Sequence, residues 1–204
     1  METVAVLDFE TTGLSPQYGD RATEIAIALV QAGVVVDRFQ SLMNSGCRIP
    51  AEITQLTGIT NAMVAAAPPA ATVMREAARF VGKLPLVAHN ASFDKKFWIS
   101  ELERLSIVPS SSFACTMLLS RRLYPNASNH QLSTLVRLLR LPPAVRAHRA
   151  MADTEMASHL WCRIQKDVSD TYGIQVVTHT LLMRVQRTPR LKMPALLQSC
   201  AQAV

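Results

Sequence analysis

The stretch VAVLDFETTGL, residues 4–14, runs from an apolar, β-branched segment directly into two carboxylates, Asp8 and Glu10. The apolar segment predicts a buried strand over residues 4–10. Side chains two positions apart lie on the same face of an extended chain, so Asp8 and Glu10 are expected side by side. Two like charges at the end of a buried strand repel each other and lose hydration. The pattern therefore predicts either a strand that surfaces into solvent or a strand end that holds a divalent metal.

The rest of the chain predicts an α/β fold whose sheet begins antiparallel and ends parallel. Residues 24–30 and 34–42 are apolar and β-branched, and the short link between them is typical of a hairpin. Further along, short apolar runs alternate with segments of helical periodicity, a pattern typical of parallel strands covered by helices. The expected later strands are 84–89 and 113–116, and the expected helices are 70–81, 92–105, 117–123, 130–139 and 150–168.

Composition fits one domain with a sizeable core and a polyanionic partner. The chain has 204 residues, of which 49% are hydrophobic, and its formal net charge of +6 favours nucleic acid. Its four cysteines form no C-x-x-C pair, as expected of reduced thiols and not of a disulfide framework or a zinc site. We see neither a signal-peptide pattern nor an apolar run long enough to span a bilayer. We therefore expect a cytoplasmic protein without a membrane partner.

A second group of polar residues, HNASFD at 89–94, follows the expected strand 84–89 and begins a helix. We expect the side chain of Asn90 to cap this helix, with Asp94 in the first turn, where the helix dipole tolerates negative charge. Phe97 and Trp98, one turn later, have the character of core residues, so Asp94 is expected to point into the protein. A helix-start aspartate favoured by the dipole alone is the alternative interpretation.

A third group, HRAMAD at 148–153, contains a histidine and an aspartate five residues apart. On one helix this spacing rotates the side chain by about 140°, so the two cannot share a face. His148 and Asp153 converge only if the helix begins between them and His148 lies on the preceding loop, which the upstream LPP sequence favours. Asp153 then begins an apolar stripe that continues at Met156 and Leu160. A solvated loop histidine is the alternative.

Together, the three groups place carboxylates where apolar strands end or apolar helix faces begin. Hard oxygen ligands suit Mg²⁺ or Mn²⁺, and four acids can hold two divalent cations. Two such ions about 3.5–4 Å apart stabilise the attacking and leaving oxygens of a phosphoryl transfer, and a nearby histidine can deprotonate the attacking water. The four acids are Asp8, Glu10, Asp94 and Asp153.

DFETTG, HNASFD and HRAMAD, in this order and spacing, resemble the three motifs of the DnaQ-like (DEDDh) 3′–5′ exonucleases. This family includes the proofreading epsilon subunit of DNA polymerase III, ribonuclease T and exonuclease X. The resemblance covers about residues 4–168. It implies an RNase H-like mixed sheet flanked by helices, and a two-metal hydrolysis that removes nucleotides from a 3′ end.

The resemblance also implies a role for each catalytic residue. Asp8 would bridge both metal ions, while Glu10 and Asp153 would complete the site of the ion that binds the nucleophile. Asp94 would serve the other ion, and His148 would be the general base.

Five further residues are implied to contact the substrate. Thr11 and Thr12 would lie beside the terminal nucleotide, with Leu14 against its base, and Asn90 and Phe93 would hold the next nucleotide. Polar turn residues and a core phenylalanine also have structural explanations.

The resemblance makes residues 1–169 an exonuclease domain and leaves 170–204 as a basic C-terminal extension. No acidic residue follows Asp170, and Pro189 and Pro194 prevent one continuous helix there. This extension is expected either to pack on the domain or to contact a partner or nucleic acid. Arg121 and Arg122 can likewise meet phosphates or be simply solvated.

The expected substrate is the 3′ end of single-stranded or frayed DNA, because only such an end threads into a site that grips its last two nucleotides. RNA 3′-end trimming is the main alternative, since local contacts decide whether a 2′-hydroxyl is accepted. A polymerase-associated subunit and a catalytically idle nucleic-acid-binding module are further hypotheses. A homodimer or a polymerase partner is also open.

Overall fold

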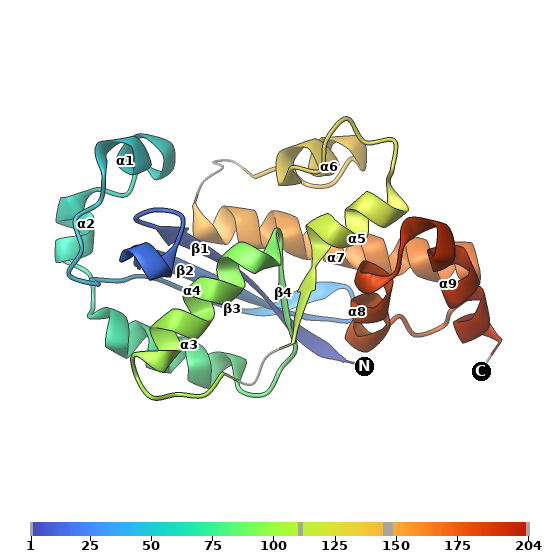
Figure 1. Ribbon diagram of the computed structural model, residues 1–204, viewed down its shortest axis with the longest axis horizontal. Coiled ribbons are helices and arrows are strands. Elements are labelled where there is room, and N and C mark those ends of the chain that lie inside the picture. Colours follow the sequence, from blue (N-terminus) through green and yellow to red (C-terminus); the bar gives the residue numbers. More distant parts are fainter. Residues whose placement is uncertain (1, 110–111, 145–148, 203–204) are drawn as a thin grey trace.

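A five-stranded mixed sheet with the order β3-β2-β1-β4-β5 forms the centre of the molecule (Figure 1). The computed structural model describes residues 2–109, 112–144 and 149–202. Strands β1 (Thr3–Thr11), β2 (Ala22–Gln31) and β3 (Val34–Leu42) pair antiparallel. Strands β4 (Leu86–Ala88) and β5 (Phe113–Cys115) continue the sheet parallel to β1. This arrangement confirms the expected RNase H-like fold.

Helices flank the sheet on both sides, and most of them lie where helical periodicity predicts them. The helix expected at 150–168 runs four residues past its expected end. Two short helices between β3 and α3, and the two helices that follow residue 172, were not predicted. The helices are α1 (Ala51–Thr57), α2 (Asn61–Ala65), α3 (Ala70–Val81), α4 (Ala91–Glu103), α5 (Thr116–Leu123), α6 (Leu132–Leu138), α7 (Ala150–Tyr172), α8 (His179–Arg187) and α9 (Met193–Ala201). None of the helices in the described ranges combines the length and apolar character needed to cross a bilayer.

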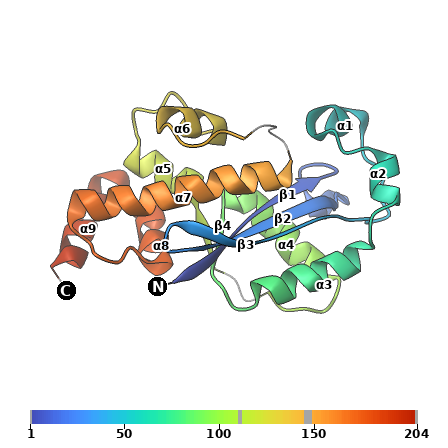
Figure 2. The same ribbon diagram turned by 180° about the vertical axis from the view of Figure 1, so that it is seen from behind.

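The alternation of side chains along β1 divides the core into two layers. Leu7 and Phe9 pack with α3 and α4 on one face of the sheet, whereas Val4 and Val6 pack with α7 on the other. Figures 1 and 2 show α7 on one side of the sheet and α3 on the opposite side. Since side chains two apart share a face, the residues that continue the Val4–Val6 row at the end of β1 face the side of α7.

The segment after α7 packs against the free edge of the sheet. Leu182 and Val185 of α8 are fully buried in the layer that contains α7. The side chain of Gln186 accepts a hydrogen bond from Cys115 N at 2.7 Å and donates one to Phe113 O at 3.3 Å. Helix α8 therefore satisfies backbone groups of β5 that an edge strand would otherwise leave exposed.

Candidate active site

Three carboxylates converge at the end of β1. Asp8 and Glu10 continue the row of β1 side chains that faces α7, and Asp153 lies in the first turn of that helix. One ligand atom of each residue lies within 4.8 Å of the corresponding atoms of the other two. Helix α7 begins at Ala150, between the two ends of the HRAMAD sequence, as predicted. The structure thus brings together acids from two segments more than 140 positions apart.

Asp94 approaches the same strand end from the opposite layer. Because β4 runs parallel to β1, the start of α4 lies beside the end of β1. Oδ1 of Asp94 accepts a hydrogen bond from Phe9 N at 3.1 Å. The Oδ2 atom is buried and lacks a hydrogen-bond partner among the described residues, while the whole residue is 1% exposed. A buried carboxylate oxygen without a donor is costly unless a cation approaches it.

The pKa values of these acids show that the bare site is electrostatically unfavourable. Burial, followed by the charges of Asp94 and Asp153, raises the pKa of Asp8 well above its ordinary range. Burial and the carboxylate of Asp153 raise the pKa of Glu10 to about 8, and burial raises that of Asp94 to about 8. A divalent cation reverses this effect because it favours the ionised form of its ligands. The chemistry of these residues therefore fits a divalent metal.

A buried ion pair that sequence reasoning missed anchors the start of α7. Glu24 of β2 is 1% exposed and accepts hydrogen bonds from Arg149 Nη2 at 2.8 Å and Nε at 3.1 Å. Ala150 N donates to it at 3.2 Å, and Gln40 Nε2 at 2.9 Å. Burial alone would raise the pKa of Glu24, but the bonds from Arg149 and Gln40 outweigh it and the pKa is lowered. His148, the residue before Arg149, lies outside the described residues.

The end of β1 and the loop after it contain the threonines and leucine that were expected near the terminal nucleotide. Thr11 Oγ1 donates to Gly13 O at 2.6 Å, and Thr12 Oγ1 accepts from Arg21 N at 3.0 Å. Both threonines are buried, whereas Leu14 is 77% exposed at the loop surface. The two hydroxyls are therefore engaged inside the loop, and the leucine side chain points outward.

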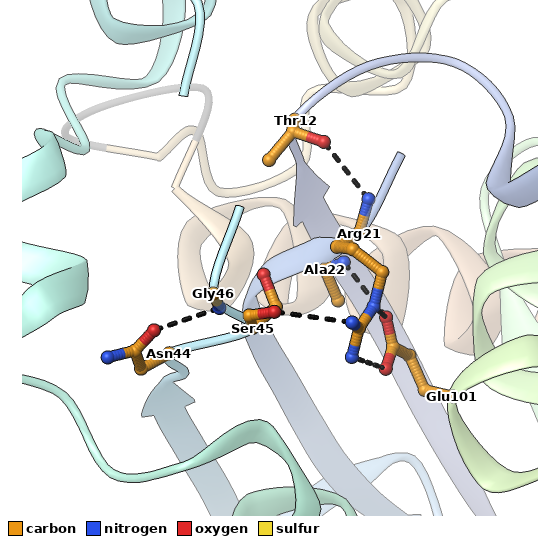
Figure 3. Close-up of polar contacts among 7 residues, drawn as sticks. All are labelled: Thr12, Arg21, Ala22, Asn44, Ser45, Gly46 and Glu101. Atoms are coloured by element: carbon orange, nitrogen blue, oxygen red, sulfur yellow. Dashed lines mark hydrogen bonds and ion pairs between the residues drawn. The ribbon is translucent and has the colours of Figure 1, made fainter. Parts of the chain in front are cut away.

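A second missed ion pair fixes the base of this loop (Figure 3). Arg21 Nε and Nη2 donate to the two carboxylate oxygens of Glu101, both at 2.8 Å, and Arg21 Nη1 donates to Ser45 O at 3.2 Å. Ala22 N also donates to Glu101, at 3.2 Å. The bidentate pair connects the residue before β2 to α4. Two parallel hydrogen bonds give an arginine–carboxylate contact a defined geometry, which restricts movement at this point.

Asn90 occupies the N-cap position of α4, but the prediction that its side chain caps the helix is wrong. Its backbone is left-handed, with φ of 63°, and its side chain makes no capping bond. A capping side chain reaches the helix amides from an extended backbone, so this conformation directs it elsewhere. The side chain is exposed, and its Oδ1 accepts from Ser92 Oγ at 3.3 Å. Phe93 is half-buried against Phe97, with ring centroids 5.0 Å apart.

His89, the other histidine of the motifs, has a structural role. Its Nδ1 lies 2.9 Å from Thr116 Oγ1, and its Nε2 lies 3.0 Å from His130 O. Burial lowers the pKa of His89 to about 4, so the ring is neutral near pH 7. With both nitrogens engaged between β4, α5 and the loop before α6, His89 is not available as a general base.

Comparison with known proteins agrees with this geometry. The exonuclease family model of the ribonuclease T type matches residues 5–160. The chain is 38% identical over 176 residues to DNA polymerase III PolC-type of Bacillus subtilis, which covers 85% of this chain and 12% of that protein. The PolC-type polymerase of Listeria innocua is 34% identical over 174 residues, again with 85% and 12% covered. The chain therefore spans only a small part of these relatives.

Solved structures share the fold. Exonuclease X in complex with 5′ overhanging duplex DNA is 27% identical, with a TM-score of 0.69, and the match covers 90% of this chain and 99% of that one. The nuclease domain of 3′hExo, a DEDDh family member bound to rAMP, has a TM-score of 0.71 at 18% identity, with 81% and 92% covered. DEDDh exonucleases depend on divalent metals, in agreement with the acidic cluster. The chain belongs to the DnaQ-like (DEDDh) family of 3′–5′ exonucleases.

Proposed function

We propose that this protein is a metal-dependent exonuclease that removes nucleotides from the 3′ end of single-stranded or frayed DNA. One observation carries the proposal. The clustered oxygens of Asp8, Glu10 and Asp153 lie beside Asp94, whose buried Oδ2 has no hydrogen-bond partner among the described residues. One buried and three half-buried carboxylates this close together repel one another, and divalent cations would offset this repulsion. Two such cations are what the hydrolysis of a phosphodiester uses.

Each acid has its own part in holding two divalent cations, Mg²⁺ or Mn²⁺. When bound, the cations would lower the pKa of the attacking water and neutralise charge on the leaving oxygen. Asp8 would hold both ions, Glu10 and Asp153 would hold one, and Asp94 would hold the other through its Oδ2 atom. The hydrogen bond from Phe9 N to Oδ1 would keep this carboxylate in one orientation.

We assign the proton transfer to His148 as general base. It precedes Arg149, whose guanidinium is bound to the buried carboxylate of Glu24 in two hydrogen bonds. This anchor supports the assignment because a general base must be held within hydrogen-bond reach of the water that it deprotonates. The imidazole would accept the proton of the water as the new P–O bond forms.

The loop after β1 and the start of α4 would grip the last two nucleotides. The exposed Leu14 offers an apolar surface to the terminal base. Thr11 and Thr12, with their hydroxyls engaged within the loop, would hold this surface in place. Asn90, with its exposed amide, and Phe93 would contact the next nucleotide. DNA is favoured because the relatives are DNA polymerases and a similar structure contains duplex DNA.

The test is cleavage of a 5′-labelled single-stranded DNA by the wild-type protein and by Asp8→Asn, with Mg²⁺, with Mn²⁺ or with a chelator. We expect a ladder that shortens from the 3′ end, that requires metal and that disappears in the variant. An RNA of identical sequence, run in parallel, decides between the two sugars. Failure of the folded wild-type protein to cleave either strand with either metal would refute the proposal.

A link to DNA replication is a second proposal, favoured by the likeness to PolC-type polymerases. In this case the protein would remove mispaired 3′ ends left by a replicative polymerase. Co-elution with the polymerase catalytic subunit of the same organism in size-exclusion chromatography tests the association. Separate elution at micromolar concentrations, with both proteins folded, would contradict a stable complex.

A further inference from the structure

A hollow of about 580 Å³ lies next to the proposed nucleotide contacts. Asn90, assigned above to the penultimate nucleotide, lines one end of it. The start of α4, strand β5, helix α5 and helix α8 form its walls. Helices α5 and α8 contact each other, and Figure 1 shows them close together beside β5. We call this hollow the basic groove.

Three cationic side chains line the basic groove, and none of its lining residues is acidic. They are Lys95 of α4, Arg121 of α5 and Arg187 of α8, and all three are exposed. Within the part of the chain that the structure describes, none of them forms an ion pair. For Arg121, the hydrogen-bond contact to the described residues is one of 3.8 Å from Nη2 to the sulfur of Met117.

The neighbouring residue, Arg122, has a structural role. Arg122 donates through Nε to Thr188 O at 2.8 Å and through Nη1 to Leu118 O at 2.7 Å. It therefore ties α5 to the end of α8. Arg121 makes no comparable contact with any residue that the structure describes, so the contacts seen here explain Arg122 but not Arg121.

The position of Arg187 follows from the way α8 packs. The preceding residue, Gln186, is bonded on both sides to the backbone of β5, which fixes the last turn of α8 beside the groove. Lys95 and Arg121 come from segments far away in the sequence. Like charges that come from three elements, without an acid among the lining residues, give the hollow a positive potential that attracts an anionic ligand.

We propose that the basic groove binds the sugar–phosphate backbone of the substrate strand upstream of its last two nucleotides. The proposal rests on the proposed function, since that function places the penultimate nucleotide at Asn90. Lysine and arginine contact phosphates without reading base sequence. The groove would thus hold a strand of any sequence as its 3′ end enters the acidic site, and the C-terminal extension would take part through Arg187.

The test is equilibrium binding of a 5′-fluorescein single-stranded DNA by fluorescence anisotropy, in EDTA so that no cleavage occurs. The groove variant combines Lys95→Gln, Arg121→Gln and Arg187→Gln. A phosphate contact on a single strand contributes about 0.7 to the slope of log Kd against log salt concentration. Loss of three contacts should therefore reduce the slope for a 12-nucleotide strand by about 2, and the loss of affinity should grow from 4 to 12 nucleotides.

A matched control removes the same net charge elsewhere. Arg75 and Arg79 lie exposed on α3, and Lys83 lies exposed just after it, and none of them lines the basic groove. The control variant Arg75→Gln, Arg79→Gln, Lys83→Gln should retain the wild-type slope. A groove variant whose melting temperature is normal but whose slope equals that of the control would overturn the proposal.

This result is distinguishable from failure of the proposed function. Binding in EDTA does not depend on catalysis. In one outcome the slope is lower for the groove variant than for the control variant, but the wild-type protein never shortens DNA with Mg²⁺ or Mn²⁺. This outcome would support the basic groove and refute the proposed exonuclease activity. A wild-type protein that cleaves DNA, with equal slopes for the groove and control variants, would refute the groove alone.

Discussion

Replacing Glu24 by glutamine is expected to destabilise the protein and to slow the reaction. The substitution keeps the size of the side chain but removes its charge. It also replaces one acceptor oxygen by an NH₂ group, which cannot accept the hydrogen bonds that Arg149, Gln40 and Ala150 N donate to Glu24. Breaking a buried pair costs about 3–5 kcal/mol. The side chain of Arg149 is 28% exposed and retains part of its hydration. We therefore expect the lower end, about 3 kcal/mol.

For a domain of this size, about 3 kcal/mol corresponds to a decrease in Tm of about 6–12 °C. The rate should also fall, because Arg149 is adjacent to His148 and a misplaced catalytic group costs about tenfold to a hundredfold. Thermal unfolding followed by circular dichroism gives the first quantity. Single-turnover cleavage with saturating Mn²⁺, well below the Tm of the variant, gives the second.

Glu155→Gln is the matched control, because Glu155 pairs with Arg38 between α7 and β3 but both side chains are exposed, at 41% and 49%. An exposed pair contributes about 0–1 kcal/mol, so this variant should melt and react like the wild type. If Glu24→Gln behaved like Glu155→Gln in both measurements, the structural explanation of the start of α7 would be incorrect.

Further predictions concern the acids and the base. His148→Ala should slow single-turnover cleavage by about two to four orders of magnitude while Mn²⁺ affinity, measured by calorimetry, is retained; near-wild-type rates at neutral pH would remove it from the mechanism. In EDTA, the free energy of unfolding should fall as pH rises from about 5 to 8, because native Glu10 and Asp94 keep protons up to pKa values of about 8 that the unfolded chain has already released. Urea titrations at each pH measure this, and a rise in stability over that range would contradict it. Asp94→Asn should raise the Tm of the metal-free protein at pH 8, where it removes a buried charge, and should reduce the Tm increase that Mn²⁺ produces; an undiminished increase would exclude Asp94 as a ligand.

The convergence of the acids was predictable because it follows from local rules. The period of two along a strand places Asp8 and Glu10 on one face, and parallel pairing brings the start of α4 to the end of β1. The helix boundary between His148 and Asp153 was predicted from their spacing together with the LPP sequence upstream. These rules need only residues close in sequence and the order of the strands.

The contacts that hold these segments in place were not predictable in this way. Glu24 pairs with a residue 125 positions away, and Arg21 with one 80 positions away. In the sequence all four look like ordinary charged residues, since nothing local marks them as buried partners. The prediction that Asn90 caps α4 was wrong for a different reason. The residue type favours a cap, but the backbone conformation decides whether the side chain reaches the helix amides.

The most direct test of the central claim is the stoichiometry of Mn²⁺ binding, measured by electron paramagnetic resonance in the presence of a deoxynucleoside monophosphate. We expect two ions per wild-type molecule with coupled spins, one ion in Asp94→Asn and none in Asp8→Asn. Folded wild-type protein that binds no Mn²⁺, or an Asp8→Asn variant that still binds two ions, would contradict the assignment of these acids as a two-cation site.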